Sequence, residues 1–296
     1  SSSGSAAAVA AGFVPAAIGT QTLGSVIRPA AFCGVYGLKP THGLIPRNGI
    51  LQLSRTLDHV GLFARSIDDL ALLLEALQGH DERDPDTRPR ARVPFGELSR
   101  EEPPVEPMFA LVKTPHWERV DADAKEALEE LREALGARVE EVDLFAASPT
   151  EPWDWHRTIL EAEMAANLEP LWRSGKEKLS EKLRTLIERG REVRALDYQR
   201  ALRCIPGTLE RLDELFRERY DAILTPPALG TAPKGLASTG DPVFCSIWTL
   251  LGMPAITLPL MQGENGLPLG VQLVGRKGFD ARLLRTARWL EKKVAS

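Results

Sequence analysis

The chain has 296 residues, enough for one large domain or two small ones with a sizeable core. Apolar residues make up 43% and charged residues 26%, as in ordinary globular proteins, and the formal net charge is −4. This acidic balance argues against a nucleic-acid or membrane-surface binder, because such proteins normally carry a basic face. The sequence contains no apolar run of about 20 residues, so we expect no transmembrane helix.

Capping residues, turn residues and apolar runs predict helices and strands in alternation. Ser66 followed by Asp69 is a helix N-cap signature, and the strand–helix–strand order of residues 109–142 predicts a parallel strand pair. The expected helices are 5–11, 66–74, 121–135, a stretch after Pro242 and 280–293; the expected strands are 14–18, 35–38, 109–112, 138–142, 222–227, 254–259 and 267–275.

The remaining segments carry weaker signals. Residues 43–53 are expected to form a loop and a short strand, and residues 78–104 a surface loop whose charge run is simply solvated. The adjacent Asp58 and His59 suggest a catalytic dyad, but sequence neighbours point in different directions. Structural hydrogen bonding is therefore the favoured role for both residues.

Residues 152–220 are predicted to form a long helical tract. We expect breaks in it near Gly175 and Gly190 and at Pro206. Several side chains near its start are interpreted as packing residues in preference to a binding site: Trp153, Trp155 and His156.

The three cysteines are odd in number and widely spaced, and no two have the spacing of zinc ligands. We interpret Cys33, Cys204 and Cys245 as buried thiols of a protein in the reducing cytoplasm. Cys33 has apolar neighbours, which would not stabilise a thiolate, so core packing is favoured over a nucleophilic role. No metal site is predicted.

A short glycine-containing turn, residues 20–25, ends at Ser25 and precedes a helix-like segment. Such turns expose backbone N–H groups beside the hydroxyl, where they can hold a developing oxyanion. A Gly-Ser pair before a helix is, however, more often an ordinary turn or cap. The local pattern therefore leaves open both a nucleophile and a structural serine.

The residues around this turn favour the nucleophile over the structural serine, because their order resembles that of a known family. It begins with Ser-Ser-Ser-Gly-Ser-Ala-Ala-Ala at residues 1–8 and continues through Thr-Gln-Thr-Leu-Gly-Ser at 20–25 to Gly-Leu-Lys-Pro-Thr at 37–41. This ordered series resembles the amidase signature family. The likeness covers roughly the first 75 and the last 80 residues of the chain.

The resemblance implies a Ser–cis-Ser–Lys triad. Ser25 matches the family's nucleophile, and Ser1, 24 positions earlier, matches the bridging serine, whose peptide bond is cis in the family. The backbone amides of four residues match the oxyanion hole: Thr22, Leu23, Gly24 and Ser25. A serine hydroxyl needs a base to become an effective nucleophile, and a desolvated neutral lysine can supply one.

Some positions depart from the family pattern. Gln21 and Leu23 replace the Asp and Gly found in many members, and Arg28 lies one place later than the usual arginine. Arg28 is a candidate substrate-carboxylate binder, although a structural salt bridge is the favoured role. Ser2 and Asp241 are further candidate substrate-binding residues.

The family's catalytic lysine lies upstream of the bridging serine and is absent from these 296 residues. Lys39 lies in the family's Gly-Leu-Lys-Pro-Thr string, which is a structural turn, and is not assigned to the triad. We therefore expect the chain to be the later part of a longer polypeptide. Without that lysine, we expect no activity.

The expected fold class is α/β, with a mixed central β-sheet covered by helices on both faces. The chain is interpreted as the C-terminal portion of a single amidase domain. Residues 1–75 would form the signature core, residues 76–219 a variable and largely helical part, and residues 220–296 the C-terminal part of the core.

The implied function is hydrolysis of a small-molecule linear amide to an acid and ammonia or an amine, through a Ser25 acyl-enzyme and without a cofactor. A cytoplasmic protein is expected, with no nucleic-acid or membrane partner, and homo-oligomerisation is left open. The alternatives are the amidase subunit of a glutamyl-tRNA amidotransferase, an allophanate-type hydrolase and a catalytically silent relative.

Overall fold

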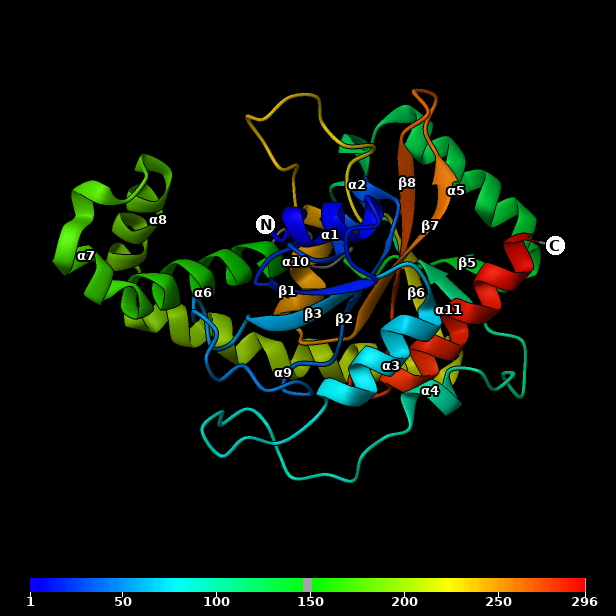
Figure 1. Ribbon diagram of the computed structural model, residues 1–296, viewed down its shortest axis with the longest axis horizontal. Coiled ribbons are helices and arrows are strands. Elements are labelled where there is room, and N and C mark those ends of the chain that lie inside the picture. Colours follow the sequence, from blue (N-terminus) through cyan, green and yellow to red (C-terminus); the bar gives the residue numbers. More distant parts are fainter. Residues whose placement is uncertain (146–150, 296) are drawn as a thin grey trace.

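A mixed eight-stranded sheet lies at the centre of the computed structural model, which describes residues 1–145 and 151–295 (Figure 1). The strand order is β1-β3-β2-β7-β8-β6-β4-β5. β4 runs parallel to β5 and to β6, as predicted for the first pair, and the other neighbours are antiparallel. The strands are β1 (Ala16–Gln21), β2 (Tyr36–Lys39), β3 (His59–Ala64), β4 (Phe109–Leu111), β5 (Val139–Glu141), β6 (Ala222–Thr225), β7 (Ala255–Gln262) and β8 (Pro268–Val274).

Helices cover both faces of the sheet, so the expected α/β fold class is confirmed. The described helices are α1 (Ser3–Ala10), α2 (Ile27–Cys33), α3 (Ile67–Leu77), α4 (Phe95–Leu98), α5 (Ala122–Leu135), α6 (Glu151–Asn167), α7 (Glu169–Gly175), α8 (Glu181–Glu192), α9 (Ala195–Glu218), α10 (Val243–Leu250) and α11 (Asp280–Ala295), with 3₁₀ turns at Trp117–Arg119, Gly136–Arg138 and Lys176–Lys178. None of the helices in the described ranges is both long enough and apolar enough to cross a membrane.

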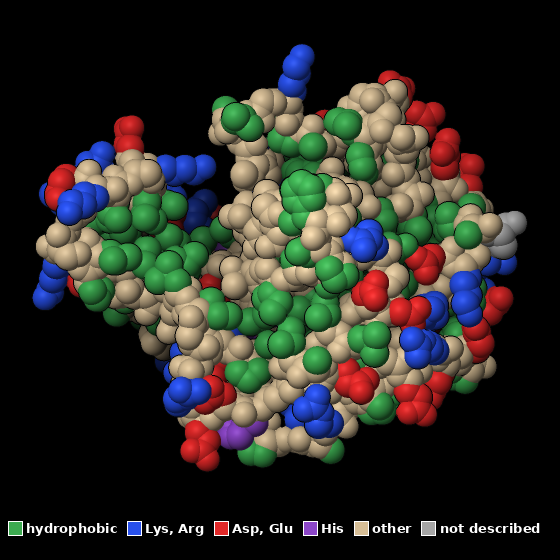
Figure 2. Space-filling view, in the orientation of Figure 1, with side chains coloured by type: hydrophobic (Ala, Val, Ile, Leu, Met, Phe, Trp, Pro, Cys, Tyr) green, Lys and Arg blue, Asp and Glu red, His purple; other side chains and the backbone are tan. Residues whose placement is uncertain are grey.

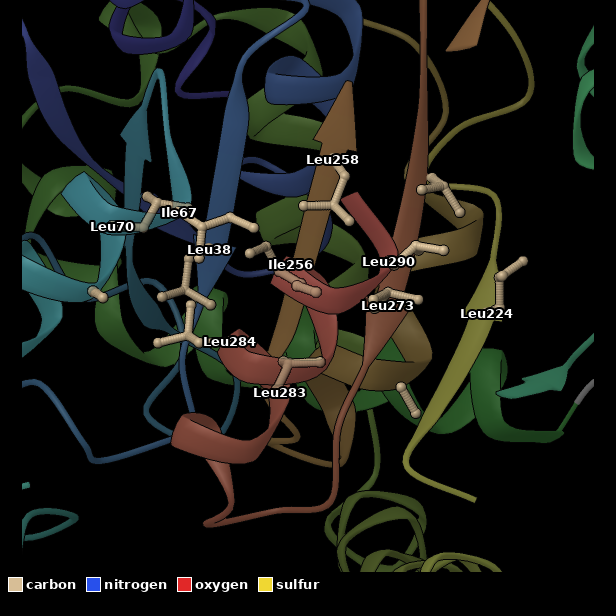
Figure 3. Close-up of a cluster of buried hydrophobic side chains, with 14 of the residues drawn as sticks. Leu38, Ile67, Leu70, Leu224, Ile256, Leu258, Leu273, Leu283, Leu284 and Leu290 are labelled. Carbon is tan, nitrogen blue, oxygen red and sulfur yellow. The ribbon is translucent and has the colours of Figure 1, made fainter. Parts of the chain in front are cut away.

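Apolar side chains of the strands alternate between the two faces of the sheet, and the two largest apolar cores lie on opposite faces. On β4, Phe109 and Leu111 enter one cluster and Ala110 enters the other, because successive side chains of a strand point to opposite faces. The first cluster lies under α3 and α11 (Figure 3). Its labelled members are Leu38, Ile67, Leu70, Leu224, Ile256, Leu258, Leu273, Leu283, Leu284 and Leu290.

The second core joins the opposite face of the sheet to α6, α9 and α10. Trp248 of α10 is fully buried in it, together with Ile159 of α6 and Ile223 of β6. This core ties the middle helices to the segment that carries the turn at residues 20–25, since Ile27 of α2 also belongs to it.

α7 and α8 form a lobe that projects from the sheet beyond α6 and α9 (Figure 1). Apolar side chains gather on the visible face of this lobe (Figure 2), and Leu171 in α7 is exposed. α8 approaches α6 closely at Gly190, where an added Cβ would lie 1.9 Å from the Glu161 carbonyl oxygen.

The expected breaks near Gly175 and Gly190 are confirmed, because α7 ends at Gly175, α8 ends at Glu192 and α9 begins at Ala195. Two other local expectations are wrong. α9 continues through Pro206, because tertiary packing sustains a helix despite an unfavourable residue. Residues 43–53 contain no strand: Arg47 donates to the carbonyl oxygens of Arg55 (2.6 Å) and Asp58 (3.1 Å) and so holds this segment as a loop.

The charge run after residue 78 is also more than a solvated surface. Asp84 is buried and accepts two hydrogen bonds from the Arg47 side chain, and Asp86 pairs with both Arg47 and Arg55. These pairs fix the loop against residues 47–55. The division of the chain at residues 75 and 219 stays a prediction.

Candidate active site

The turn that ends at Ser25 lies between β1 and α2, and the side chain of Gln21 shapes it from within. The Gln21 Oε1 atom accepts hydrogen bonds from the amides of Val26 (2.9 Å) and Ile27 (3.0 Å), and its Nε2 atom donates to Thr249 Oγ1 (3.0 Å). Gln21 is 1% exposed, so each of these bonds replaces one that water would make. The departure from the family's Asp therefore has a structural role.

Two carbonyl groups of the turn are fixed by side chains from distant helices. His156 of α6 donates through Nε2 to the Thr22 carbonyl oxygen (2.9 Å), and Thr249 of α10 donates through Oγ1 to the Leu23 carbonyl oxygen (2.7 Å). In a planar trans peptide the C=O and N–H bonds point in opposite directions. The Leu23 and Gly24 amides therefore point away from His156 and Thr249.

Within the described residues, the backbone amides of Leu23, Gly24 and Ser25 donate to no protein group. Ser25 itself is half-buried, so its side chain is not sealed inside the core. Consecutive unpaired N–H groups form a concave anion-binding arrangement. The turn can thus present donors to a negative charge that develops next to the Ser25 hydroxyl.

Gly24 allows this turn to lie close to the start of α10. An added Cβ at Gly24 would lie 2.9 Å from the Cβ atoms of both Cys245 and Pro242. A side chain at this position would push the turn away from α10, and with it the amides beside Ser25.

The first residues of the chain lie beside Ser25. The Ser2 amide donates to the Ser25 carbonyl oxygen (3.1 Å), which places Ser1 next to the proposed nucleophile in space. The Ser1 hydroxyl shares a hydrogen bond with that of Ser3 (2.7 Å). No peptide bond between described residues is cis; the bond on the amino side of Ser1 lies outside the chain, so the cis expectation is untested.

Two of the candidate substrate-binding side chains make internal contacts. The Ser2 hydroxyl donates to the Thr20 carbonyl oxygen (3.2 Å) and accepts from the Thr20 amide (3.1 Å). Asp241 pairs with Arg119 and accepts from the Val243 amide (2.9 Å) at the start of α10. These contacts give both side chains structural roles, and their contact with substrate stays a prediction.

Arg28 differs, because the expected salt bridge is not formed. Its side chain is 4% exposed, yet no described carboxylate lies within ion-pair distance of it. One nitrogen donates to Thr239 Oγ1 (3.2 Å), while the buried Nε atom has no partner among the described residues. Burial lowers the pKa of Arg28, and the electrostatic influence of Cys245 and Asp241 opposes this shift. A buried cation without a counter-ion is suited to an anionic ligand group.

Asp58 and His59 form structural hydrogen bonds, as expected, and not a dyad. Asp58 accepts from the Thr22 hydroxyl (2.7 Å), whereas His59 Nδ1 contacts the Leu57 carbonyl oxygen (2.7 Å). Burial raises the pKa of Asp58, and its hydrogen bonds, the one from Thr22 first, oppose that shift. Asp58 therefore supports the turn through the Thr22 side chain, whereas His156 and Thr249 hold backbone carbonyl groups.

The cysteines and Lys39 take no part in the turn's hydrogen bonds. Burial raises the pKa of Cys33 and raises that of Cys245 to about 12, so both stay thiols at neutral pH. Only Cys245 is fully buried; Cys33 and Cys204 are half-buried, contrary to expectation.

The Lys39 ammonium donates to the carbonyl oxygens of Met253 and Pro40, consistent with a structural role. The described residues include no cluster of His, Cys, Asp and Glu able to hold a metal ion.

The sequence did not reveal the role of His156, which was expected to be a packing residue. Its contact with Thr22 joins residues 134 positions apart in the chain. One pattern could have drawn attention to it: His156, Glu163 and Asn167 are spaced so that they share one face of a helix.

Comparison with known proteins identifies the family of this chain. A model of the Amidase family matches residues 1–284. The chain belongs to this family. It is 34% identical to a subunit of the glutamyl-tRNA(Gln) amidotransferase of Thermotoga maritima, over 99% of this chain and 67% of that protein.

Solved structures of other proteins share the fold. A protein from a vestigial complex linked to the evolutionary origins of an s-triazine catabolic enzyme has a TM-score of 0.87 and 25% identity, over 98% of this chain and 65% of that one. The 6-aminohexanoate cyclic dimer hydrolase complexed with substrate has a TM-score of 0.83 and 26% identity, over 100% and 68%. The chain thus spans about two thirds of the length of these relatives.

Proposed function

We propose that this amidase-family protein hydrolyses a carboxamide through an acyl-enzyme on Ser25. The observation that carries this proposal is that the amides of Leu23, Gly24 and Ser25 have no hydrogen-bond acceptor among the described residues, while His156 and Thr249 fix the first two peptide planes. A preorganised donor set of this kind stabilises the oxyanion of acyl transfer, and losing one donor typically slows such enzymes by about 10²- to 10³-fold.

In the proposed mechanism, the Ser25 oxygen attacks the amide carbonyl carbon and the carbonyl oxygen becomes an oxyanion held by the turn amides. The Ser25 proton passes through the Ser1 hydroxyl to a lysine, which the family pattern places outside residues 1–296. That proton then reaches the leaving nitrogen as the C–N bond breaks. Water hydrolyses the resulting ester and releases the acid.

Arg28 supports a preference for substrates that carry a second, anionic group. It follows the nucleophile by three positions, and its buried guanidinium has no carboxylate partner among the described residues. A substrate carboxylate would supply the missing counter-charge. We therefore propose glutaramate-like amides as better substrates than neutral amides of the same length.

A second candidate is the ammonia-releasing subunit of an amidotransferase. It is favoured by the relatives, since glutamyl-tRNA(Gln) amidotransferase subunits from bacteria and mitochondria are 31–34% identical to this chain. In that case glutamine would be the amide hydrolysed, and a partner protein would use the ammonia. Glutaminase activity that depends on a copurifying partner would favour this candidate over a stand-alone amidase.

The test is ammonia release by the polypeptide that carries residues 1–296, measured with valeramide, benzamide, glutamine and glutaramate. Ser25→Ala should abolish turnover without changing the melting temperature, and Ser1→Ala should slow it strongly. Full activity of Ser25→Ala would overturn the proposal.

The same substrates test Arg28. In Arg28→Met, kcat/KM for glutaramate should fall by about tenfold to a hundredfold, because a charge-assisted hydrogen bond is lost, while valeramide hydrolysis should change little. Equal losses on both amides would show that Arg28 only stabilises the turn.

A further inference from the structure

We propose that His156 is a positioning residue: by holding the Thr22 carbonyl group, it aims the Leu23 amide at the oxyanion. This inference rests on the proposed function, because it assigns a task to a residue that touches neither the substrate nor the nucleophile. It also makes helix α6, from the middle of the chain, part of the machinery that sets the rate at Ser25.

The protonation state of His156 and the nature of its partner show which ring nitrogen carries the hydrogen. His156 is 2% exposed, and burial lowers its pKa to about 4, so the ring is neutral at pH 7 and carries one N–H. The Thr22 carbonyl oxygen can only accept, and it lies 2.9 Å from Nε2. The ring hydrogen therefore sits on Nε2.

The hydrogen bond fixes a peptide plane. The Thr22 carbonyl group and the Leu23 amide belong to the same planar unit and point in opposite directions. A rotation of this unit that breaks the bond to His156 would turn the Leu23 N–H by the same angle. Such small misplacements at a reacting centre can slow catalysis by about 10²-fold.

α6 also holds Thr22 indirectly, through the Thr22 hydroxyl. The Thr22 hydroxyl donates to Asp58 Oδ1 (2.7 Å), while Asp58 Oδ2 accepts from the amides of Leu53 (2.8 Å) and Ser54 (2.9 Å). Asp58 thus links the turn to the loop at residues 53–58. This loop is in turn held by α6.

The α6 contacts to this loop come from the same helix face as His156. Glu163 accepts from the Thr56 amide (3.0 Å) and hydroxyl (2.6 Å), and Asn167 donates to the Leu53 carbonyl oxygen (3.0 Å). Positions 156, 163 and 167 lie seven and eleven residues apart, close to whole numbers of helical turns. One polar face of α6 therefore holds Thr22 in two ways: directly through its carbonyl group, and indirectly through the loop and Asp58.

The test compares four variants of the polypeptide that carries this chain. His156→Leu removes the donor, His156→Asn keeps a polar group too short to reach Thr22, and His156→Gln places an amide nitrogen near the Nε2 position. Ile159→Val, at a fully buried position one turn further along α6, trims the apolar core without removing a hydrogen bond to the turn. Each is assayed with the preferred amide for kcat and KM, and with a fluorophosphonate for the rate at which Ser25 displaces fluoride.

His156→Leu and His156→Asn should lower kcat and the labelling rate by about tenfold to a hundredfold, with KM changed less than about twofold. His156→Gln should recover most of the loss, and Ile159→Val should behave like the parent protein. Should His156→Leu not fold, the contrast between Asn and Gln decides the question.

Parent-like rates in His156→Asn, or equal losses in all four variants, would overturn the inference and leave His156 as a packing residue. Ser25→Ala distinguishes a failure of the positioning role from a failure of the proposed function. If Ser25→Ala abolishes turnover while His156→Asn is unaffected, only the positioning role fails. If Ser25→Ala stays active, the proposed function fails first.

Discussion

Lys39 is fully buried, and within the described structure its ammonium group donates to carbonyl oxygens, those of Met253 and Pro40. Burial lowers the pKa of Lys39 to about 7, although the nearby Asp280 opposes the shift. A lysine with these contacts was recognisable from the sequence only as part of a family string. Its burial follows from the pairing of β2 with β7, which residue spacing does not reveal.

The pKa of Lys39 predicts how stability depends on pH. Between about pH 7 and its ordinary pKa of 10.5, the unfolded chain holds a proton that the folded chain has released. The free energy of unfolding should therefore rise with pH in this window, by at most about 1.4 kcal/mol per unit from this one group. Lys39→Met should flatten the rise measured by urea unfolding between pH 7 and 9.

The exposed Lys234 provides the control for this measurement. Lys234→Met should keep the parental slope of stability against pH. An unchanged slope in Lys39→Met would show that Lys39 titrates near its ordinary pKa in the folded protein, contrary to the effect of its burial.

The hydrogen bonds of Gln21 could not be predicted from the sequence for a different reason. The sequence marked it as a departure from the family's Asp, but its amide bonds three partners at once: two amides at the start of α2 and the Thr249 hydroxyl. Thr249 lies 228 residues away in the sequence, so the pair becomes visible only after folding.

At the scale of helices, the contact between α6 and α8 depends on a single glycine. A break was expected near Gly190, and α8 does end two residues later, at Glu192. Gly190 itself lies inside α8, where it allows the backbone to approach the Glu161 carbonyl group. Helix propensity favours the breaking of a helix at glycine, whereas close packing favours glycine between two helices.

A pair of glycine substitutions separates these effects. Gly190→Ala should destabilise the protein by about 1–3 kcal/mol or more, because its Cβ would lie 1.9 Å from the Glu161 carbonyl oxygen. Gly207→Ala in α9 has open space around it and should instead stabilise by about 0.5–1 kcal/mol. Equal melting temperatures in thermal unfolding would contradict the tight contact between α6 and α8.

For the whole molecule, the order of elements was largely predictable because both ends of the chain alternate clear apolar runs with turn residues. The structure joins these ends directly: β2 pairs with β7, so the first 64 and the last 75 residues share one sheet. The middle helices were predicted as a tract without a site. Their link to the turn depends on tertiary contacts, above all the one from His156 to Thr22, that no local pattern encodes.

The candidate site was predictable in part. The resemblance identified Ser25, Ser1 and the turn amides as candidates, since these lie in one continuous motif, and their catalytic roles stay predictions. The supports of the turn come from α6, α10 and the loop at residues 53–58, and Arg28 was expected to have a salt-bridge partner that the described structure does not provide.

Fluorophosphonate labelling followed by peptide mapping tests the central claim most directly. In the polypeptide that carries this chain, the Ser25 oxygen should displace fluoride and form a phosphonyl ester, with the Ser25 proton taken by the catalytic base. We expect a single stoichiometric adduct on the peptide that contains Ser25, and no adduct in Ser25→Ala. An adduct on another residue, or equal labelling of Ser25→Ala, would show that Ser25 is not the nucleophile.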